Sequence, residues 1–263
     1  MNNLGYIYSE NGDNENGLIL LKEALLIRNK LFNGDHPDIA CTLHNIGIVE
    51  RRLKHYEKAI DASNESLSML KRIHNEKHHS LASNYNELGM LYTANNQWEK
   101  ALEMYKEAIN ILENTLGPEH IHIGITLSNI GSLYEDLEDF KSAVKYDLKA
   151  LPIYIKSYGE CSVKLASLYN HISRMYFKME DYSNALKYMK LKFNIIEQNY
   201  DDNSIEFIYT WNSLSQIYNK LNDKKSEINC LENVINIGNQ ILDENNKGLQ
   251  NAKKRIKELK DKS

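Results

Sequence analysis

The sequence predicts an all-α protein made of antiparallel helix pairs, and three observations support this prediction. The chain of 263 residues holds only 3 prolines and 12 glycines, too few to supply the turns of a many-stranded sheet. A small residue recurs every 42 residues without any insertion, and aromatic residues and alanines recur at fixed distances from it. A fixed period of this kind indicates a repeat architecture. The repeated small residue, here called the marker residue, is Gly5, Gly47, Gly89, Gly131, Ser173 and Ser215.

The first helix of each copy is predicted around its marker residue. The position just before the marker holds Leu4, Ile46, Leu88, Ile130, Ile172 and Leu214. The position three after the marker holds Tyr8, Glu50, Tyr92, Tyr134, Tyr176 and Tyr218. These positions share one face of a helix, because residues four apart lie one turn from each other. A small marker residue on that face lets a second helix approach closely.

A second helix is predicted after a short polar turn such as 94–97 or 136–139. The position twelve after the marker holds Gly17, Ala59, Ala101, Ala143, Ala185 and Glu227, and three residues before it stand Asn14, Tyr56, Trp98, Phe140, Tyr182 and Lys224. Connectors rich in glycine and proline, as at 33–37 and 117–119, then end one copy and begin the next. Each copy therefore reads as helix, turn, helix, connector.

This order of a small residue, Tyr, an aromatic residue and Ala, followed by Ala108-Ile109 or Ala150-Leu151, resembles the tetratricopeptide repeat (TPR) over nearly the whole chain. The usual unit has about 34 residues, so the additional eight are expected to lengthen the second helix. Units of this length, with connectors such as 34–40 and 116–120, resemble the kinesin light chain subfamily. HEAT and armadillo arrays have a similar period, but the internal spacing favours the TPR. The resemblance implies a right-handed superhelical solenoid of helix hairpins.

The two ends depart from this pattern. Residues 1–243 are expected to form six helix pairs, the first truncated because Met1 already lies inside its first helix. The last pair is degenerate, since Lys224 and Glu227 replace the packing aromatic residue and alanine, and we expect it to pack more loosely. Residues 244–263 are expected to form a capping helix and a tail. The apolar residues of that helix are Leu249, Ala252, Ile256 and Leu259.

The composition limits which classes of function are expected. The formal net charge of −4, from 32 basic and 36 acidic residues, gives no general attraction to nucleic acid or to an anionic membrane. No apolar run approaches the roughly 18 residues needed to span a bilayer. Cys41, Cys161 and Cys230 lie far apart and are odd in number, which predicts neither disulfides nor a zinc site and favours a reducing compartment such as the cytoplasm.

The resemblance implies that the first helices line a concave surface that binds extended peptides. Three residues before each marker stand Asn2, His44, Asn86, Ser128, Asn170 and Asn212. An asparagine side chain can donate to a peptide carbonyl and accept from a peptide N–H, so this column could hold a peptide backbone. The alternative is that these side chains cap or bridge neighbouring helices.

Basic residues mark both ends of the same predicted groove. They are Arg51, Arg52, Arg174, Lys178 and Lys220. Acidic residues at 135 and 136 stand between them in the chain. This pattern would suit an acidic peptide, because charge-assisted hydrogen bonds are strong. The alternative is that each long charged side chain is simply solvated.

Catalysis and metal binding find little support. His36, His78 and His120 are 42 residues apart and recur because the connector recurs, although His74 and His78 could chelate a metal by chance. No phosphate-binding loop or nucleophile motif is present, and the acidic residues are expected on exposed helix faces. We therefore predict a scaffold or adaptor without a cofactor that binds proteins through linear segments and could self-associate. The alternative is a regulatory or oligomerising segment of a larger enzyme or motor.

Overall fold

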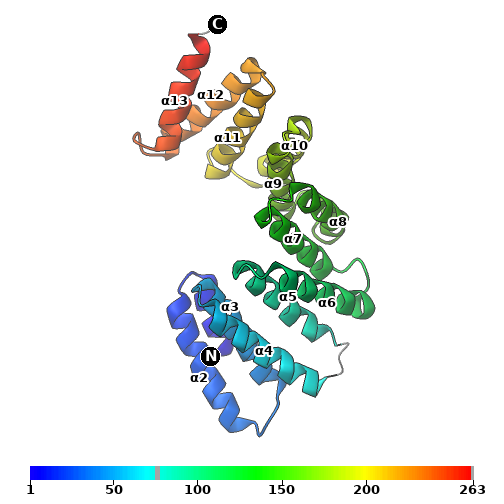
Figure 1. The fold of residues 1–263 in the computed structure, drawn as a ribbon. Helices are drawn as coiled ribbons and strands as arrows, with labels where there is room; N and C mark the ends of the chain where they lie inside the picture. Colours follow the sequence, from blue (N-terminus) through cyan, green and yellow to red (C-terminus); the bar gives the residue numbers. More distant parts are fainter. Residues whose placement is uncertain (75–77, 262–263) are drawn as a thin grey trace. The chain divides into compact units, whose positions relative to one another are not determined.

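The computed structural model describes residues 1–74 and 78–261, and within these ranges it contains helices and no strand (Figure 1). None of these helices combines the length and the apolarity needed to cross a bilayer. The helices are α1 (Asn2–Glu10), α2 (Asn14–Leu31), α3 (Pro37–Arg52), α4 (Tyr56–Ile73), α5 (His79–Ala94), α6 (Trp98–Leu116), α7 (Ile121–Asp136), α8 (Phe140–Tyr158), α9 (Val163–Lys178), α10 (Tyr182–Asn199), α11 (Ile205–Lys220), α12 (Lys224–Ile241) and α13 (Lys247–Lys260).

The predicted alternation of first and second helices is confirmed. The first helices α3, α5, α7, α9 and α11 each have 16 residues. The second helices α2, α4, α6, α8, α10 and α12 have 18 or 19. The second helix is thus the longer of each pair, as the 42-residue period predicts. Helix α1 is shorter than the other first helices, with nine residues.

The turn inside each pair repeats with the same backbone geometry. The residue seven after each marker has a positive φ, and the next N–H bonds back into the first helix, as the N–H of His55 does to the carbonyl of Glu50 at 2.9 Å. Only the first of these positions is a glycine. They are Gly12 (φ 90°), Lys54 (64°), Asn96 (56°), Glu138 (58°), Glu180 (60°) and Asn222 (57°).

The recurring histidines act as helix caps. The Nδ1 atom of His36 accepts from the N–H of Asp38 at 3.1 Å, and the Nδ1 atom of His78 accepts from that of Ser80 at 3.3 Å. Their 42-residue spacing therefore follows from the repeated connector. The rings of His74 and His78 are stacked with centroids 4.0 Å apart, and the described part of the chain contains no group of three or more residues able to hold a metal.

Close packing at the marker positions is confirmed. A Cβ atom added to Gly89 would lie 2.5 Å from Cε1 of Tyr105, and that ring is 1% exposed. The alanines twelve after the markers, Ala59, Ala101, Ala143 and Ala185, are fully buried. Small residues at both places therefore bring the two helices of a pair into contact.

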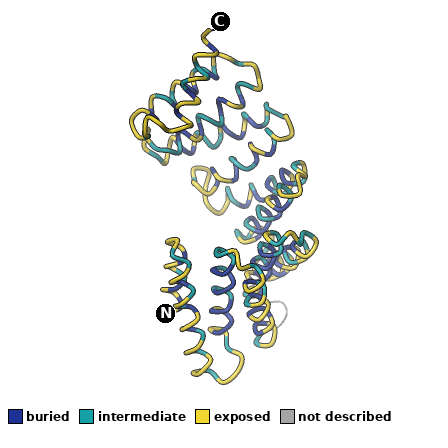
Figure 2. The backbone as a smooth tube through the Cα atoms, turned by 60° about the vertical axis from the view of Figure 1, so that its left-hand side comes forward, coloured by how far each residue is buried: buried dark blue, intermediate teal, exposed yellow. Residues whose placement is uncertain are grey.

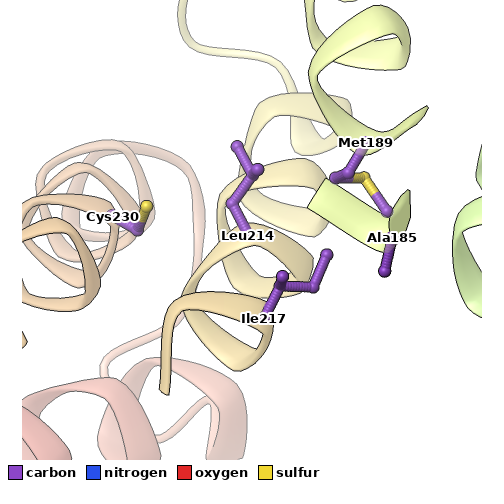
Figure 3. Packing of buried hydrophobic residues seen from close by; sticks show 5 residues of the cluster. All are labelled: Ala185, Met189, Leu214, Ile217 and Cys230. Carbon is purple, nitrogen blue, oxygen red and sulfur yellow. The ribbon is translucent and has the colours of Figure 1, made fainter. Parts of the chain in front are cut away.

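The chain divides into two compact units, unit 1 (Met1–Leu133) and unit 2 (Tyr134–Ser263), with the boundary inside α7. In both units burial follows the repeat, with buried positions on the facing sides of the helices and exposed positions at the turns (Figure 2). Part of the core of unit 2 is shown in Figure 3. There α10, α11 and α12 contribute Ala185, Met189, Leu214, Ile217 and Cys230.

At the C-terminal end of unit 2, α13 packs against α12. Leu249 of α13 is 1% exposed and lies beside Gly238. Glu227 of α12 is buried and accepts hydrogen bonds from Nε of Arg255 at 2.7 Å and from Nδ2 of Asn219 at 3.0 Å. The looser packing of the last pair stays a prediction, while α13 supplies the cation that the buried carboxylate of Glu227 needs.

Candidate peptide-binding groove

The candidate site is a hollow of about 620 Å³ in unit 1. Four successive first helices contribute to its wall: α1, α3, α5 and α7. Their residues include Tyr6, His44, Ile48, Ser83, Asn86 and Ile125. Within unit 1, the first helices thus line one concave surface, and two members of the predicted asparagine column lie in it.

The hollow combines an apolar surface with polar groups. Ile48, Leu112 and Ile125 supply apolar surface, while His44 and His122 supply imidazole rings. Burial lowers the pKa of His44, with Glu87 and the hydrogen-bond partner Asn84 acting in the opposite direction. Burial also lowers the pKa of His122, and the neighbouring His120 adds to this effect. Both shifts favour the neutral imidazole, which suits hydrogen bonding with a peptide better than attraction of an acidic one.

Two asparagines of the column bridge neighbouring copies. The Oδ1 atom of Asn2 accepts from Nδ2 of Asn45 at 3.3 Å, and the Oδ1 atom of Asn86 accepts from Nδ2 of Asn129 at 3.0 Å. The bridging alternative is thus observed at both places. The hydrogen bond from Asn129 occupies the Oδ1 atom of Asn86 and orients its amide group. The Nδ2 atom of Asn86 donates to no group in the described parts of the chain.

The remaining members of the column lie in different surroundings. The Oδ1 atom of Asn170 accepts from Nζ of Lys192 at 3.0 Å, and Asn170 lines a hollow of about 170 Å³ in unit 2 together with Arg174. The Oγ atom of Ser128 is buried and has no hydrogen-bond partner among the described residues. Asn212 is half-buried.

The predicted basic residues of unit 1 are engaged in ion pairs between copies. Nε of Arg51 lies 2.6 Å from Oε1 of Glu87, and Nη1 of Arg52 donates to Oγ of Ser9 at 2.9 Å. Arg52 also pairs with Glu10, and the hydrogen bond from Arg52 lowers the pKa of that carboxyl. These guanidinium groups hold first helices of adjacent copies together.

In unit 2 the predicted cations are used in three ways. Nη2 of Arg174 lies 2.6 Å from Oε2 of Glu135. Nζ of Lys178 lies 5.5 Å from the ring centroid of Phe140, within cation–π range. Lys220 is exposed and lines a hollow of about 350 Å³. Of these three, Lys220 is the residue most available to a ligand carboxylate.

The expectation that acidic residues occupy exposed faces is wrong at four positions. Glu50, Glu87, Asp147 and Glu227 are at most 3% exposed. Each accepts from a cation or imidazole, because a buried carboxylate needs such a partner. At Glu50, burial alone would raise the pKa, but hydrogen bonds from His55 and Lys22 hold it below its ordinary value. At Asp147, burial raises the pKa while His171 opposes the shift.

The position one after the marker also contributes to the hollow of unit 1, although no groove residue was predicted there in the first two copies. Tyr6 and Ile48 occupy it in the first two copies and line the hollow of unit 1. This position lies four residues after the asparagine column and so on the same helix face, as Ile48 does after His44. Helical spacing alone could have identified it.

Two sequence profiles described as tetratricopeptide repeat match the chain, one over residues 1–72 and 80–156 and another over 166–191 and 208–237. No curated protein sequence matches significantly. Three solved structures share the fold. BtubC (BKLC) from P. vanneervenii is 19% identical with a TM-score of 0.75, covering 87% of this chain and 92% of that one. A putative kinesin light chain with nearly identical TPR-like repeats from Podosopora anserina is 18% identical with a TM-score of 0.62, covering 76% and 95%.

The third structure is the apo form of RapI, which is 15% identical with a TM-score of 0.64 and covers 99% of this chain and 96% of that one. At these identities the likeness concerns the fold alone. The profiles cover more than half of the residues, and the small marker residues and buried alanines explain why they match. The chain belongs to the tetratricopeptide repeat family, and its structural neighbours include kinesin light chain-like repeats.

Proposed function

We propose that this chain is a protein-binding scaffold that holds an extended peptide segment in the hollow of unit 1. One observation supports this most directly: four successive first helices wall a cavity of about 620 Å³. That volume falls in the range of ligand pockets and accommodates a large side chain with its flanking backbone. TPR proteins commonly bind other proteins, and the proposal is for binding rather than catalysis.

The segment we expect carries a large apolar anchor residue. Ile48, Leu112 and Ile125 offer the apolar surface. The Nδ2 atom of Asn86, which donates to none of the described residues, can donate to a peptide carbonyl. The guanidinium groups of Arg51 and Arg52 are already paired, so they add little attraction for an acidic peptide. An acidic segment remains the second candidate at Lys220 in unit 2, whose ammonium group is exposed beside a hollow.

The test begins with random peptides displayed on phage and selected on the full chain. Selected peptides are then titrated by fluorescence anisotropy against the parent and against Ile125→Arg, which places a long cation in the hollow. We expect apolar-anchored peptides whose affinity falls roughly tenfold or more in the variant, since about 1.4 kcal/mol corresponds to tenfold. Lys106→Glu, an exposed change on α6, is the matched control. Equal binding by the Ile125→Arg chain would exclude this hollow as the site.

We further propose that the protein is located in the cytoplasm. As an alternative function, we propose that the chain is a regulatory or oligomerising segment of a larger enzyme or motor. The location is supported by three free cysteines, of which Cys41 and Cys161 are exposed. Burial raises the pKa of the third, Cys230, to about 12, so its thiol is unreactive. Fractionation of cells that produce a tagged chain tests the location.

A further inference from the structure

Four of the nine histidines of the chain line the hollow of unit 1. They come from α3, from α5, from the connector before α7 and from α7 itself. Only the residue at position 120 belongs to the connector column that recurs every 42 residues, and the other three stand at positions where no other copy has a histidine. The repeat therefore does not explain why these four rings meet. This histidine cluster consists of His44, His79, His120 and His122.

The wall of the hollow contains little negative charge that could balance these rings. Glu87 is the one carboxylate among the described residues of the wall, and Nε of Arg51 already lies 2.6 Å from its Oε1 atom. From α1 the hollow receives Tyr6, whose pKa is raised by burial and by a nearby carboxylate, so its phenol group stays neutral. From α6 it receives Leu112 and Leu116. Protonated imidazoles would therefore bring uncompensated positive charge to the hollow.

His44 lies where such a charge is costly. Its ring is half-buried, and its Nδ1 atom is 3.2 Å from Oδ1 of Asn84. Burial lowers the pKa of His44, while Glu87 and the hydrogen bond with Asn84 oppose the shift. An apolar anchor residue in the hollow would remove further water from this ring and raise the cost of the charged form. A bound segment should thus favour the neutral imidazole.

The other rings of the cluster lie close to further imidazoles. The ring centroids of His120 and His122 are 5.1 Å apart, and those of His79 and His78 are 4.4 Å apart. Like charges at these distances repel, so protonation of one ring of a pair disfavours protonation of the other. Burial lowers the pKa of His122, and His120 adds to this effect. Charging the whole histidine cluster is therefore costly, and an apolar ligand increases that cost.

We propose that protonation of the histidine cluster regulates binding in the hollow, so that an apolar-anchored segment binds at neutral pH and is released as the pH falls toward 5. This inference rests on the proposed function, because it concerns the same hollow and the same kind of segment. Since the complex favours neutral rings, affinity is highest above about pH 6.5 and is lost as protons bind below that value. Each ring that must stay neutral contributes at most about a tenfold loss per pH unit.

The probe is the tightest peptide selected on the full chain at pH 7.5 from a phage library without Asp, Glu, His and Cys. It is synthesised with an acetylated N-terminus and an amidated C-terminus, so that it does not titrate between pH 5 and 8. Fluorescence anisotropy gives its dissociation constant at pH 7.5 and at pH 5. We expect this constant to rise roughly tenfold or more at pH 5. A constant that stays the same or falls would overturn the proposal.

A double variant, His44→Asn with His122→Ser, removes two of the four titrating rings. Asn86 and Ser80 occupy the same two positions in the third copy, so the repeat accommodates both residues. We expect the rise in the dissociation constant to shrink to about threefold, because half of the rings remain. His36→Gln changes a cap outside the hollow, so it is the control and should keep the full rise. An unchanged rise in the folded double variant would contradict the assignment to this cluster.

Calorimetry of the parent chain supplies a measurement that needs no variant. The same peptide is titrated at pH 6 in two buffers with different enthalpies of ionisation, and the difference in apparent enthalpy gives the number of protons exchanged. We expect protons to be released on binding, whereas uptake or no exchange would overturn the proposal. Circular dichroism at pH 5 should show a folded chain, since unfolding there would make the release a loss of the fold.

The outcomes separate this regulation from the proposed function on which it rests. If no peptide binds at either pH, the proposed function and the regulation both fail. If a peptide binds, is lost in Ile125→Arg and has the same affinity at pH 7.5 and pH 5, the hollow is the binding site and only the regulation by pH is overturned.

Discussion

Units 1 and 2 contain the same repeat but fill the marker position differently. In unit 1, Gly89 leaves room for the buried ring of Tyr105. In unit 2, Ser173 stands at the equivalent place, and its Oγ atom donates to the carbonyl of Ala185 at 2.7 Å. Neither residue has a positive φ. The repeat therefore demands small volume at the marker, and the facing side chain decides whether a hydroxyl group can be accommodated.

The units also differ at the ends of the chain. Unit 1 exposes Leu4 and Ile7 of α1, whereas unit 2 covers α12 with α13. At this covered end the usual alanine is replaced by Glu227, which binds Arg255 of α13. The residue that departs from the repeat is thus matched to the helix that follows it. A residue that departs from the repeat pattern can therefore form a specific contact with a neighbouring helix, and it need not indicate loss of the repeat.

Removing Arg255, the cation at the C-terminal end of unit 2, should lower the stability of the protein more than the other substitutions below. Arg255→Ala leaves the carboxylate of Glu227 buried with Asn219 as its remaining donor. We expect the free energy of unfolding to fall by roughly 3 kcal/mol, because removing the partly exposed Arg255 strands the buried charge of Glu227. Urea unfolding followed by circular dichroism measures the change.

The double variant Arg255→Ala with Glu227→Ala is the control for this change. It introduces the alanine found in copies two to five and removes the stranded charge, so it should recover most of the loss. A double variant as unstable as Arg255→Ala alone would mean that Arg255 acts through packing of its aliphatic stem and not through the ion pair.

Substitutions at the marker positions of the two units should cause the next largest loss of stability. Gly89→Ala places a methyl group against the ring of Tyr105, which is 1% exposed and cannot move aside. We expect a loss of about 2 kcal/mol, the cost of overpacking less the better helix propensity of alanine. Ser173→Ala should lose only about 1 kcal/mol, the worth of one buried hydrogen bond. Thermal unfolding of both variants compares them, and equal losses would show that volume does not distinguish the two sites.

Histidines in the two units should respond to pH in opposite directions. In unit 2, burial alone would lower the pKa of His171, but Asp147, with Oδ2 2.5 Å from Nδ1, and Glu135, with Oε2 2.8 Å from Nε2, raise it above its ordinary value of 6.5. In unit 1, burial lowers the pKa of His44 and of His122. The charged form is thus favoured at His171 and the neutral form at His44 and His122.

Proton linkage determines the direction in which stability changes with pH. Because the folded-state pKa of His171 is raised, its contribution is complete below about pH 6.5 and is lost as pH rises through the folded value. Glu135 also forms an ion pair with Arg174. We expect the stability difference between the parent and His171→Gln to shrink between pH 6 and 9, by at most about 1.4 kcal/mol per pH unit. His44→Gln should not reproduce this trend, and a difference independent of pH would contradict the charged state of His171.

Most of the fold was predictable from the sequence because close packing repeats its volume limits every 42 residues. Gly89 and Ala101 carry that signal without reference to any distant partner. The buried carboxylates were not predictable in this way. Glu87 depends on Arg51, which stands 36 residues earlier in the chain, so no local pattern distinguishes it from a solvated glutamate.

The candidate site was predictable only in part. Helical spacing placed His44 and Asn86 on the face that lines the hollow, and the same spacing points to Ile48. It could not show that Arg51 and Arg52 are already paired, because ion pairs between copies depend on how far one first helix is displaced along the next.

A substitution in the turn that all copies share should change the stability least. Unit 1 begins with Gly12 at the position of positive φ, whereas Glu180 of unit 2 adopts φ 60° at the equivalent place. A side chain in this region costs about 1 kcal/mol, so Glu180→Gly should raise the free energy of unfolding by about 0.5–1 kcal/mol, despite the greater entropy of glycine in the unfolded chain. Glu180→Ala, which keeps the Cβ atom but removes the carboxylate, is the matched control and should gain nothing. A gain in both variants of similar size would trace the effect to charge, whereas a gain in glycine alone would locate it in the backbone.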